Sequence, residues 1–284
     1  MKKHTLIALV ICIALATVSC SPSSNPTAPV TLSTSASEGS QPTATLPPAT
    51  EVSSAEPDES QATAVGGSSE SMKIGSALNL VIGTADRPSV YSSYHLESYL
   101  ESPRLNDDNT AVVINKTKLS AEVQGKNIHL FYTPQGADQA KEGYLIGIKE
   151  YRVTNGKPEE MIGQIGLSWA GWHLSATFPF AAGASIATKT GTETLDGRQA
   201  DVYTVDSAKV SPAVMEGFRT MGMFPLNTIK GTIWIDQKTG GALKANIDYE
   251  MDVVDNQMDK TVGTGKGHLD LAITQIDQVT VQAP

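Results

Sequence analysis

The chain has 284 residues, of which 40% are hydrophobic and 18% charged, and its formal net charge at pH 7 is −9. Because it is acidic and has no run of Lys and Arg interleaved with aromatic residues, nucleic acid is excluded as an expected partner. The same balance disfavours binding to anionic lipid headgroups through surface charge.

The first 19 residues have the parts of an export signal. Lys2 and Lys3 give a positive start, and the apolar run LIALVICIALA extends from Leu6 to Ala16. This run is shorter than the roughly 20 apolar residues that span a bilayer. A signal peptide over residues 1–19 is therefore favoured over a transmembrane helix.

Two cleavage sites fit this leader. The tripeptide ALA that ends at Ala16 has the A-x-A pattern, and cleavage there would release a soluble protein. Alternatively, Cys20 resembles the modified cysteine of a bacterial lipoprotein signal, although Thr17 stands where that signal usually carries Leu. The other cysteine, Cys12, lies in the leader, so Cys20 has no partner for an intramolecular disulfide. We expect acyl chains on Cys20 to anchor the protein to the outer face of a bacterial membrane.

Residues 20–72 comprise this cysteine and a segment with the composition of a disordered linker. Residues 21–72 contain seven of the 15 prolines, no aromatic residue and no Lys or Arg, and six acids carry all their charge. Such a segment cannot bury enough apolar surface to offset its conformational entropy. As a flexible coil it would reach roughly 40 Å, which makes it a tether for residues 73–284.

Residues 73–284 are predicted to form one domain rich in antiparallel strands, because apolar and polar residues alternate along them. The clearest case is ALKANIDYEMDVV (242–254), in which the residues from Leu243 to Val253 alternate between two faces. Two hairpins are expected, TGTETLDGRQADVYTVD with a turn at Asp196–Gly197, and GTIWIDQKTGG leading into 242–254. About nine strands in meander order follow from these patterns and from four further segments. Those segments are 89–100, 117–133, 142–157 and 267–276.

Two segments break the alternation and predict short helices. GLSWAGWHLSATFPF (166–180) is one. SPAVMEGFRTMGMF (211–224) is the other, because Ser211 suits an N-cap and Pro212 the first helical position. The expected fold class is therefore α+β, a long curved antiparallel sheet with two short helices.

The hairpin GTETLDGRQADVYTVD (191–206), a helical insert and then the hairpin beginning at Gly231 together resemble the lipoprotein-localisation-factor superfamily, which is LolA/LolB-like. The likeness is strongest to LppX/LprG-type bacterial lipoproteins, and GYLIGIKEYRVTNGKPEEMI (143–162) is similar to a strand pair of that family. The resemblance covers roughly residues 90–284. It implies a β half-barrel wrapped around helices, with an apolar cavity that accepts acyl chains of lipids or lipoproteins.

The apolar side chains of the two helical segments are the candidate ligand-binding residues. Methionine is flexible enough to fit variable hydrophobic ligands, and an acyl chain needs apolar walls. The alternative is that these side chains simply fill the core. The candidates are Trp169, Trp172, Phe178, Met215, Phe218, Met221 and Phe224.

The sequence predicts no catalytic, metal or cofactor site. The four histidines of the domain form no H-x-H or H-E-x-x-H pair. Ser168 lies in GLSWAG, which lacks the final glycine of a nucleophile elbow. GTGKGH (263–268) lacks phosphate-loop spacing and is expected to be a glycine-rich strand connection. Two functions remain, a lipid-binding lipoprotein and a non-catalytic surface interaction or sensing module with a filled core.

Overall fold

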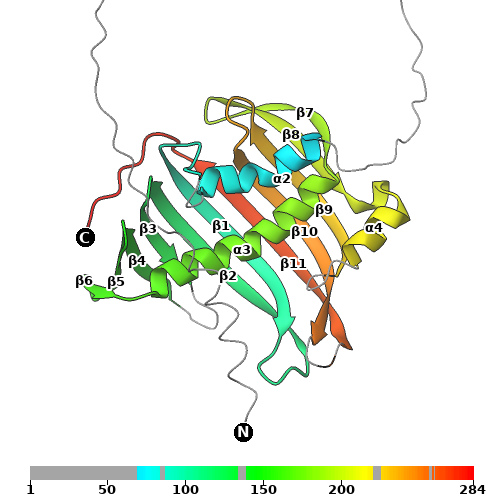
Figure 1. Cartoon of the computed structure of the whole chain (residues 1–284), viewed down its shortest axis with the longest axis horizontal. Coiled ribbons are helices and arrows are strands. Elements are labelled where there is room, and N and C mark those ends of the chain that lie inside the picture. Colours follow the sequence, from blue (N-terminus) through cyan, green and yellow to red (C-terminus); the bar gives the residue numbers. More distant parts are fainter. Residues whose placement is uncertain (1–68, 84–86, 134–138, 220–224, 256–257, 259) are drawn as a thin grey trace, which may run out of the picture. The chain divides into compact units, whose positions relative to one another are not determined.

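The computed structural model of the chain describes residues 69–83, 87–133, 139–219, 225–255, 258 and 260–284. Residues 61–284 form one compact unit, in which eleven strands make a single antiparallel sheet (Figure 1). Cys20, Met221 and Phe224 lie outside the described residues. The strands are β1 (Ser93–Leu105), β2 (Val112–Gln124), β3 (Asn127–Tyr132), β4 (Lys141–Ile146), β5 (Lys149–Thr154), β6 (Lys157–Met161), β7 (Thr188–Leu195), β8 (Arg198–Asp206), β9 (Leu226–Asp236), β10 (Ala242–Asp255) and β11 (Lys260–Thr274).

In the part of the chain that the structure describes, four helical segments accompany the sheet. They are α2 (Ser69–Ile82), α3 (Gln164–Ser185), the 3₁₀ helix η2 (Ser207–Lys209) and α4 (Pro212–Arg219). Both α2 and α3 lie on one face of the sheet (Figure 1). Helix α3 crosses this face, because it contacts β5 near one edge of the sheet and β8 near the other. The predicted α+β class, an open curved antiparallel sheet around helices, is confirmed. Within the described ranges, no helix has the length and hydropathy that crossing a membrane requires.

The strand order is β6-β5-β4-β3-β2-β1-β11-β10-β9-β8-β7. Two meanders, β1–β6 and β7–β11, are therefore joined along the chain by α3 and in the sheet by the pairing of β1 with β11. In that pairing, His95 lies opposite Thr274 and Glu101 lies opposite His268. β1 and β11, the first and last strands along the chain, are thus neighbours at the centre of the sheet.

Period-two alternation gives the sheet an apolar inner face, towards the helices, and a polar outer face. Along β10, the residues Leu243, Ala245 and Ile247 are buried, whereas Lys244 and Asn246 are exposed. Because β11 and β1 follow the same alternation in register, their buried leucines continue the inner face. The fully buried large side chains include Tyr94, Phe180, Leu78, Leu96, Leu119, Leu130, Ile229, Ile233, Ile247 and Leu269.

The predicted hairpins are confirmed. β7 pairs with β8 around Asp196 and Gly197, which both have positive φ, as a two-residue type I′ turn requires. β9 pairs with β10 around a turn that contains Gly240, whose φ is also positive. Short-range turn chemistry therefore specified these two hairpins.

Several predicted elements needed correction. The sheet has eleven strands rather than about nine, because β4, β5 and β6 are three short strands with two-residue turns. Helix α3 has 22 residues and is longer than the short helix predicted over 166–180, because it continues through Pro179 into an Ala- and Gly-rich end. Helix α2 was not predicted. The segment GTGKGH lies inside β11 rather than in a connection.

The two edges of the open sheet are protected from pairing with other strands. At one edge, β6 contains Pro158, which has no N–H to donate. At the other, β7 is exposed along nearly its whole length, but its pairing with β8 shifts register between Lys189 and Gly191. A bulge and a charged side chain on an edge strand both disfavour edge-to-edge association.

Candidate functional site

Helix α3 is the main element on the helix-covered inner face, and it carries three of the seven predicted ligand-binding residues, Trp169, Trp172 and Phe178. The first turn of α3 has no acidic residue and no side-chain cap at Gly163. Instead, the Glu150 carboxylate on β5 accepts hydrogen bonds from the backbone N–H groups of Ile165 (3.0 Å) and Gly166 (3.2 Å). A negative charge there satisfies free N–H groups and complements the helix dipole. Sequence reasoning missed this cap because Glu150 lies in a different element.

Helix α3 contains no Asp, Glu, Lys or Arg. The indole Nε1 of Trp172 donates to Ser98 Oγ on β1 at 3.0 Å. His173 Nε2 lies 2.8 Å from Asn79 Oδ1 on α2, and burial lowers the pKa of His173, which favours its neutral form. Apart from the Glu150 cap at its first turn, the contact of α3 with the sheet is therefore apolar, with the neutral pair of Trp172 and Ser98 in it.

The structure brings some of the seven candidate residues together. The rings of Trp169 and Trp172 are in contact, with centroids 5.2 Å apart and planes at 38°. Trp172 is buried, and Trp169 and Phe178 are partly buried against the same core. Met215 and Phe218 are half-buried on α4, which packs against β9. Met221 and Phe224 follow α4, outside the described residues.

Among the buried side-chain polar atoms that have no hydrogen-bond partner in the described residues are two hydroxyls. They are the Tyr94 hydroxyl on β1 and Thr177 Oγ1 on α3. Tyr94 is fully buried, its ring makes an edge contact with Tyr91, and burial raises the pKa of its hydroxyl well above the usual value. A buried hydroxyl without a partner costs about 1–3 kcal/mol, so such atoms usually mark a bound water or ligand group. The sequence contains no signal for this feature.

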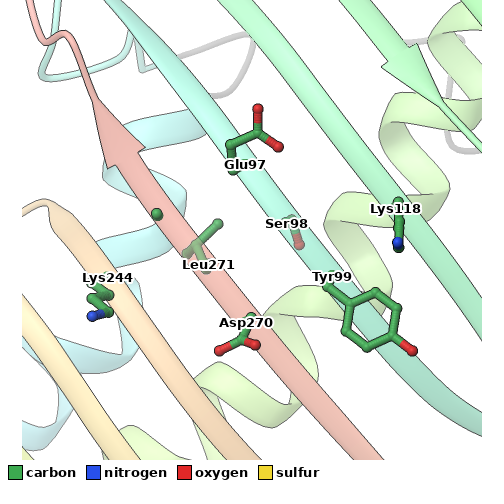
Figure 2. Close-up of a pocket in the computed structure, with 8 residues that line it drawn as sticks. Glu97, Ser98, Tyr99, Lys118, Lys244, Asp270 and Leu271 are labelled. Carbon is green, nitrogen blue, oxygen red and sulfur yellow. The ribbon is translucent and has the colours of Figure 1, made fainter.

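The outer face carries two open depressions. One, of about 360 Å³, is lined by Glu97, Tyr99, Lys118, Lys244 and Asp270, together with the strand residues between them (Figure 2). The other, of about 320 Å³, lies around Asp248, Tyr249 and Lys266. Neither is lined by any of the seven candidate residues.

Carboxylates of the outer face are engaged with neighbouring side chains. His268 lies between Asp248 (Nδ1 to Oδ1, 2.7 Å) and Asp270 (Nε2 to Oδ2, 2.9 Å). Burial lowers the pKa of His268, but the hydrogen bonds and charges of the two aspartates outweigh it, so the net shift is upwards. Glu97 accepts a hydrogen bond from Ser120 at 2.7 Å and lies 2.8 Å from His95 Nε2. These contacts give the outer face a network of cross-strand polar pairs.

The chemistry considered at Ser168 has no geometric support. The hydroxyl of Ser168 donates to the carbonyl of Gln164 in its own helix at 2.9 Å, while His173 pairs with Asn79. The described residues contain no group of three or more His, Cys, Asp and Glu side chains that could hold a metal ion.

Comparison with known proteins shows that this chain is similar to several solved structures. No protein-family model and no curated protein matches the chain. The lipoprotein LppX of Mycobacterium tuberculosis is 15% identical with a TM-score of 0.38, over 74% of this chain and 96% of LppX. LprF of Mycobacterium bovis is 13% identical with a TM-score of 0.38, over 76% of this chain and 95% of LprF. The LolA superfamily protein NE2245 of Nitrosomonas europaea is 10% identical with a TM-score of 0.22, over 78% of this chain and 96% of NE2245. The solved structures similar to this chain thus include the LppX-type lipoproteins and the LolA superfamily that its sequence resembles.

Proposed function

We propose that this chain is a membrane-anchored extracytoplasmic lipoprotein whose domain binds or carries a lipid or other hydrophobic ligand between α3 and the inner face of the sheet. The observation that carries the proposal is the pairing of an uncharged 22-residue helix with an apolar sheet face that contains a buried hydroxyl without a hydrogen-bond partner. Acyl chains would lie against the candidate aromatic and methionine side chains. The Tyr94 hydroxyl would donate to a polar oxygen of the ligand.

A ligand can enter this space if α3 moves, and the helix is built so that its movement has a low electrostatic cost. Because no residue of α3 is charged, lifting the helix breaks no buried salt bridge of its own. Pro179 has no N–H for the carbonyl four residues before it, so the helix has a weak point near its C-terminal third. The hydrogen bond from Trp172 to Ser98 would open, and the two from Ile165 and Gly166 to the Glu150 carboxylate would open as well if the first turn moved.

The proposal is tested by organic extraction and mass spectrometry of purified residues 61–284, the compact unit, expressed without the leader. We expect lipid or another hydrophobic molecule to co-purify in near-stoichiometric amount. A stable domain that purifies free of ligand and takes up none from added phospholipid would contradict the proposal.

Tyr94→Phe is expected to separate ligand binding from folding. The variant removes only the buried hydroxyl, so the ligand-free domain should be as stable as wild type or up to about 1 kcal/mol more stable. Ligand affinity should fall by roughly tenfold, the value of one lost hydrogen bond. Tyr144→Phe is the control, because Tyr144 lies on the outer face, where its hydroxyl donates to Glu142. Unchanged ligand content in Tyr94→Phe would rule out this polar contact.

Cys20→Ala is expected to move the protein from the membrane to the soluble or secreted fraction, without acyl chains. Two or more acyl chains hold a protein on a bilayer durably, and the variant removes their attachment point. Fractionation and mass spectrometry of the N-terminal peptide measure both effects. Cys12→Ala, which changes the other cysteine, is the control and should stay in the membrane fraction. A Cys20→Ala protein that remains with membranes would refute the anchor at this position.

The alternative function is a surface interaction or sensing module with a filled core. One observation favours it, namely that both depressions described above open on the outer face and not beneath α3. On this alternative, the candidate aromatic residues are core side chains. The extraction experiment separates the two functions, because only the first requires a ligand.

A further inference from the structure

The most exposed large hydrophobic side chains of the described residues share one region of the surface. Ile148 and Ile162 are each 97% exposed, and Leu167 and Leu174 are each 73% exposed. Exposed apolar residues scattered singly need no explanation, but a contiguous group marks an interaction surface. These four residues are called the α3 strip below.

The pairing of the strands places two members of the α3 strip, Ile148 and Ile162, at the corner of the sheet where α3 begins. Glu150 on β5 lies opposite Met161 on β6, so Ile148 and Ile162, just beyond those residues, occupy the same corner of the sheet. Helix α3 begins at this corner, where Glu150 caps its first turn. Leu167 and Leu174 are seven residues apart and so lie on one side of the helix. The exposed residues between them, Ala170 and Gly171, are also uncharged.

The composition of the strip favours a lipid surface over a protein partner. Energetically dominant protein contacts are enriched in Trp, Tyr and Arg, whereas the strip is aliphatic and the helix that carries it has no charged residue. Charged side chains of the central strands, such as Lys118, Lys244 and Asp270, project from the opposite face of the sheet (Figure 2). Helix α3 therefore presents an uncharged surface, whereas the outer face of the sheet is charged.

The first described element of the chain, α2, lies on the helical side of the domain. Sixty-eight residues come before α2, which starts at Ser69 and packs against α3. We propose that the α3 strip docks on the surface of a lipid bilayer, with its aliphatic side chains inserted at the headgroup boundary. The choice of a bilayer as the occupant rests on the proposed anchor at Cys20, because a tethered domain needs only weak affinity to stay on the surface that holds it.

The test uses residues 21–284, which contain the whole compact unit but neither the leader nor Cys20. The protein is floated with phosphatidylcholine vesicles that contain either no phosphatidylglycerol or about 30% of this anionic lipid. We expect wild type to co-float to a similar extent on both vesicle types and at low and high salt, because apolar insertion does not depend on lipid charge. The double variant Leu167→Asp/Leu174→Asp should lose roughly tenfold or more of the bound fraction.

The matched control is Ile114→Asp/Phe131→Asp, which adds the same two charges at exposed apolar residues of the outer face. It should bind vesicles as wild type does, and thermal unfolding should show that both double variants are folded. Wild type that does not float, or a control that loses binding equally, would overturn the proposal. A strip variant that keeps vesicle binding but loses self-association in sedimentation would also overturn it, in favour of an interface between copies. Ligand content is measured on the same samples, so a domain that floats without ligand refutes the proposed function but not this one.

Discussion

Gly231→Ala is expected to destabilise the domain more than any other substitution considered. Gly231 lies in β9 opposite Ile247 of β10, with φ at +154°, a conformation that residues with a side chain rarely adopt. A Cβ added there would lie 2.1 Å from the carbonyl oxygen of Asn246 and 2.8 Å from the Cα of Ile247. Both atoms belong to the backbone of a central strand pair, so a side-chain rotation cannot relieve the overlap.

Separating β9 from β10 at this point would break ladder hydrogen bonds and open the inner face around Ile247. We expect the free energy of unfolding to fall by about 4 kcal/mol or more, a large part of the 5–15 kcal/mol typical of a domain. Urea unfolding followed by circular dichroism measures the loss. Gly191→Ala in β7 is the control, because nothing lies within 4 Å of an added Cβ there, and it should change stability little. A Gly231→Ala protein with the wild-type midpoint would contradict the geometry of this strand pair.

Asp236→Asn is expected to have the second largest effect on stability. Asp236 is only 1% exposed, and its carboxylate accepts hydrogen bonds from Arg198 (2.6 Å) and Thr239 Oγ1 (2.6 Å). The backbone N–H of Lys238 donates to its other oxygen at 3.2 Å, and the Arg198 guanidinium also lies over the ring of Tyr91. Neutralising the carboxylate leaves Arg198 without its counter-charge, and removing one partner of a buried pair costs about 3–5 kcal/mol.

The same site predicts how stability changes in acid. Burial raises the pKa of Asp236, but the hydrogen bonds from Thr239 and Arg198 outweigh it and hold the pKa below the ordinary value. The stabilisation is therefore present above the unfolded-state pKa, about 3.9, and is lost as the pH falls through the lower folded-state pKa. Urea unfolding at pH 7 and pH 3 should show a smaller loss in Asp236→Asn than in wild type.

Asp108→Asn, at an exposed loop position, is the control and should match wild type at both pH values. Equal stability of Asp236→Asn and wild type at neutral pH would mean that the Arg198 pair contributes nothing net.

Much of the sheet could be predicted because its information is local. The alternation from Leu243 to Val253 specifies a strand with one buried face, and Asp196–Gly197 specifies a two-residue turn. The pairing of β1 with β11 could not be predicted in this way, since no local pattern relates residues near 95 to residues near 274. The resemblance to a family pointed to the correct architecture where local reasoning stopped.

The features that were missed depend on contacts between distant residues. Helix α2 follows a Ser-rich stretch and is defined by its burial under the sheet, where Leu78 and Val81 are fully enclosed. GTGKGH forms part of β11 because the ring of Tyr249, on the neighbouring strand, covers Gly267, where a Cβ would lie 2.1 Å from the ring. Sequence reasoning named the aromatic residues of α3 as candidates for the site. It could not find the buried Tyr94 hydroxyl, because Tyr94 lies in an ordinary strand pattern and its burial depends on the tertiary structure. The lipid anchor and the ligand-binding roles stay predictions.

The central position of β11 has a consequence for the order in which the chain can fold. Until β11 is in place, β1 and β10 have no partner at the centre, and the two meanders are not joined by any strand pairing. Pairings between residues so far apart in sequence form slowly. A chain that enters a translocation channel from its N-terminus would therefore remain open until residues 260–284 had passed through. A nascent chain that lacks only these last residues would lose the middle of its sheet and not its rim.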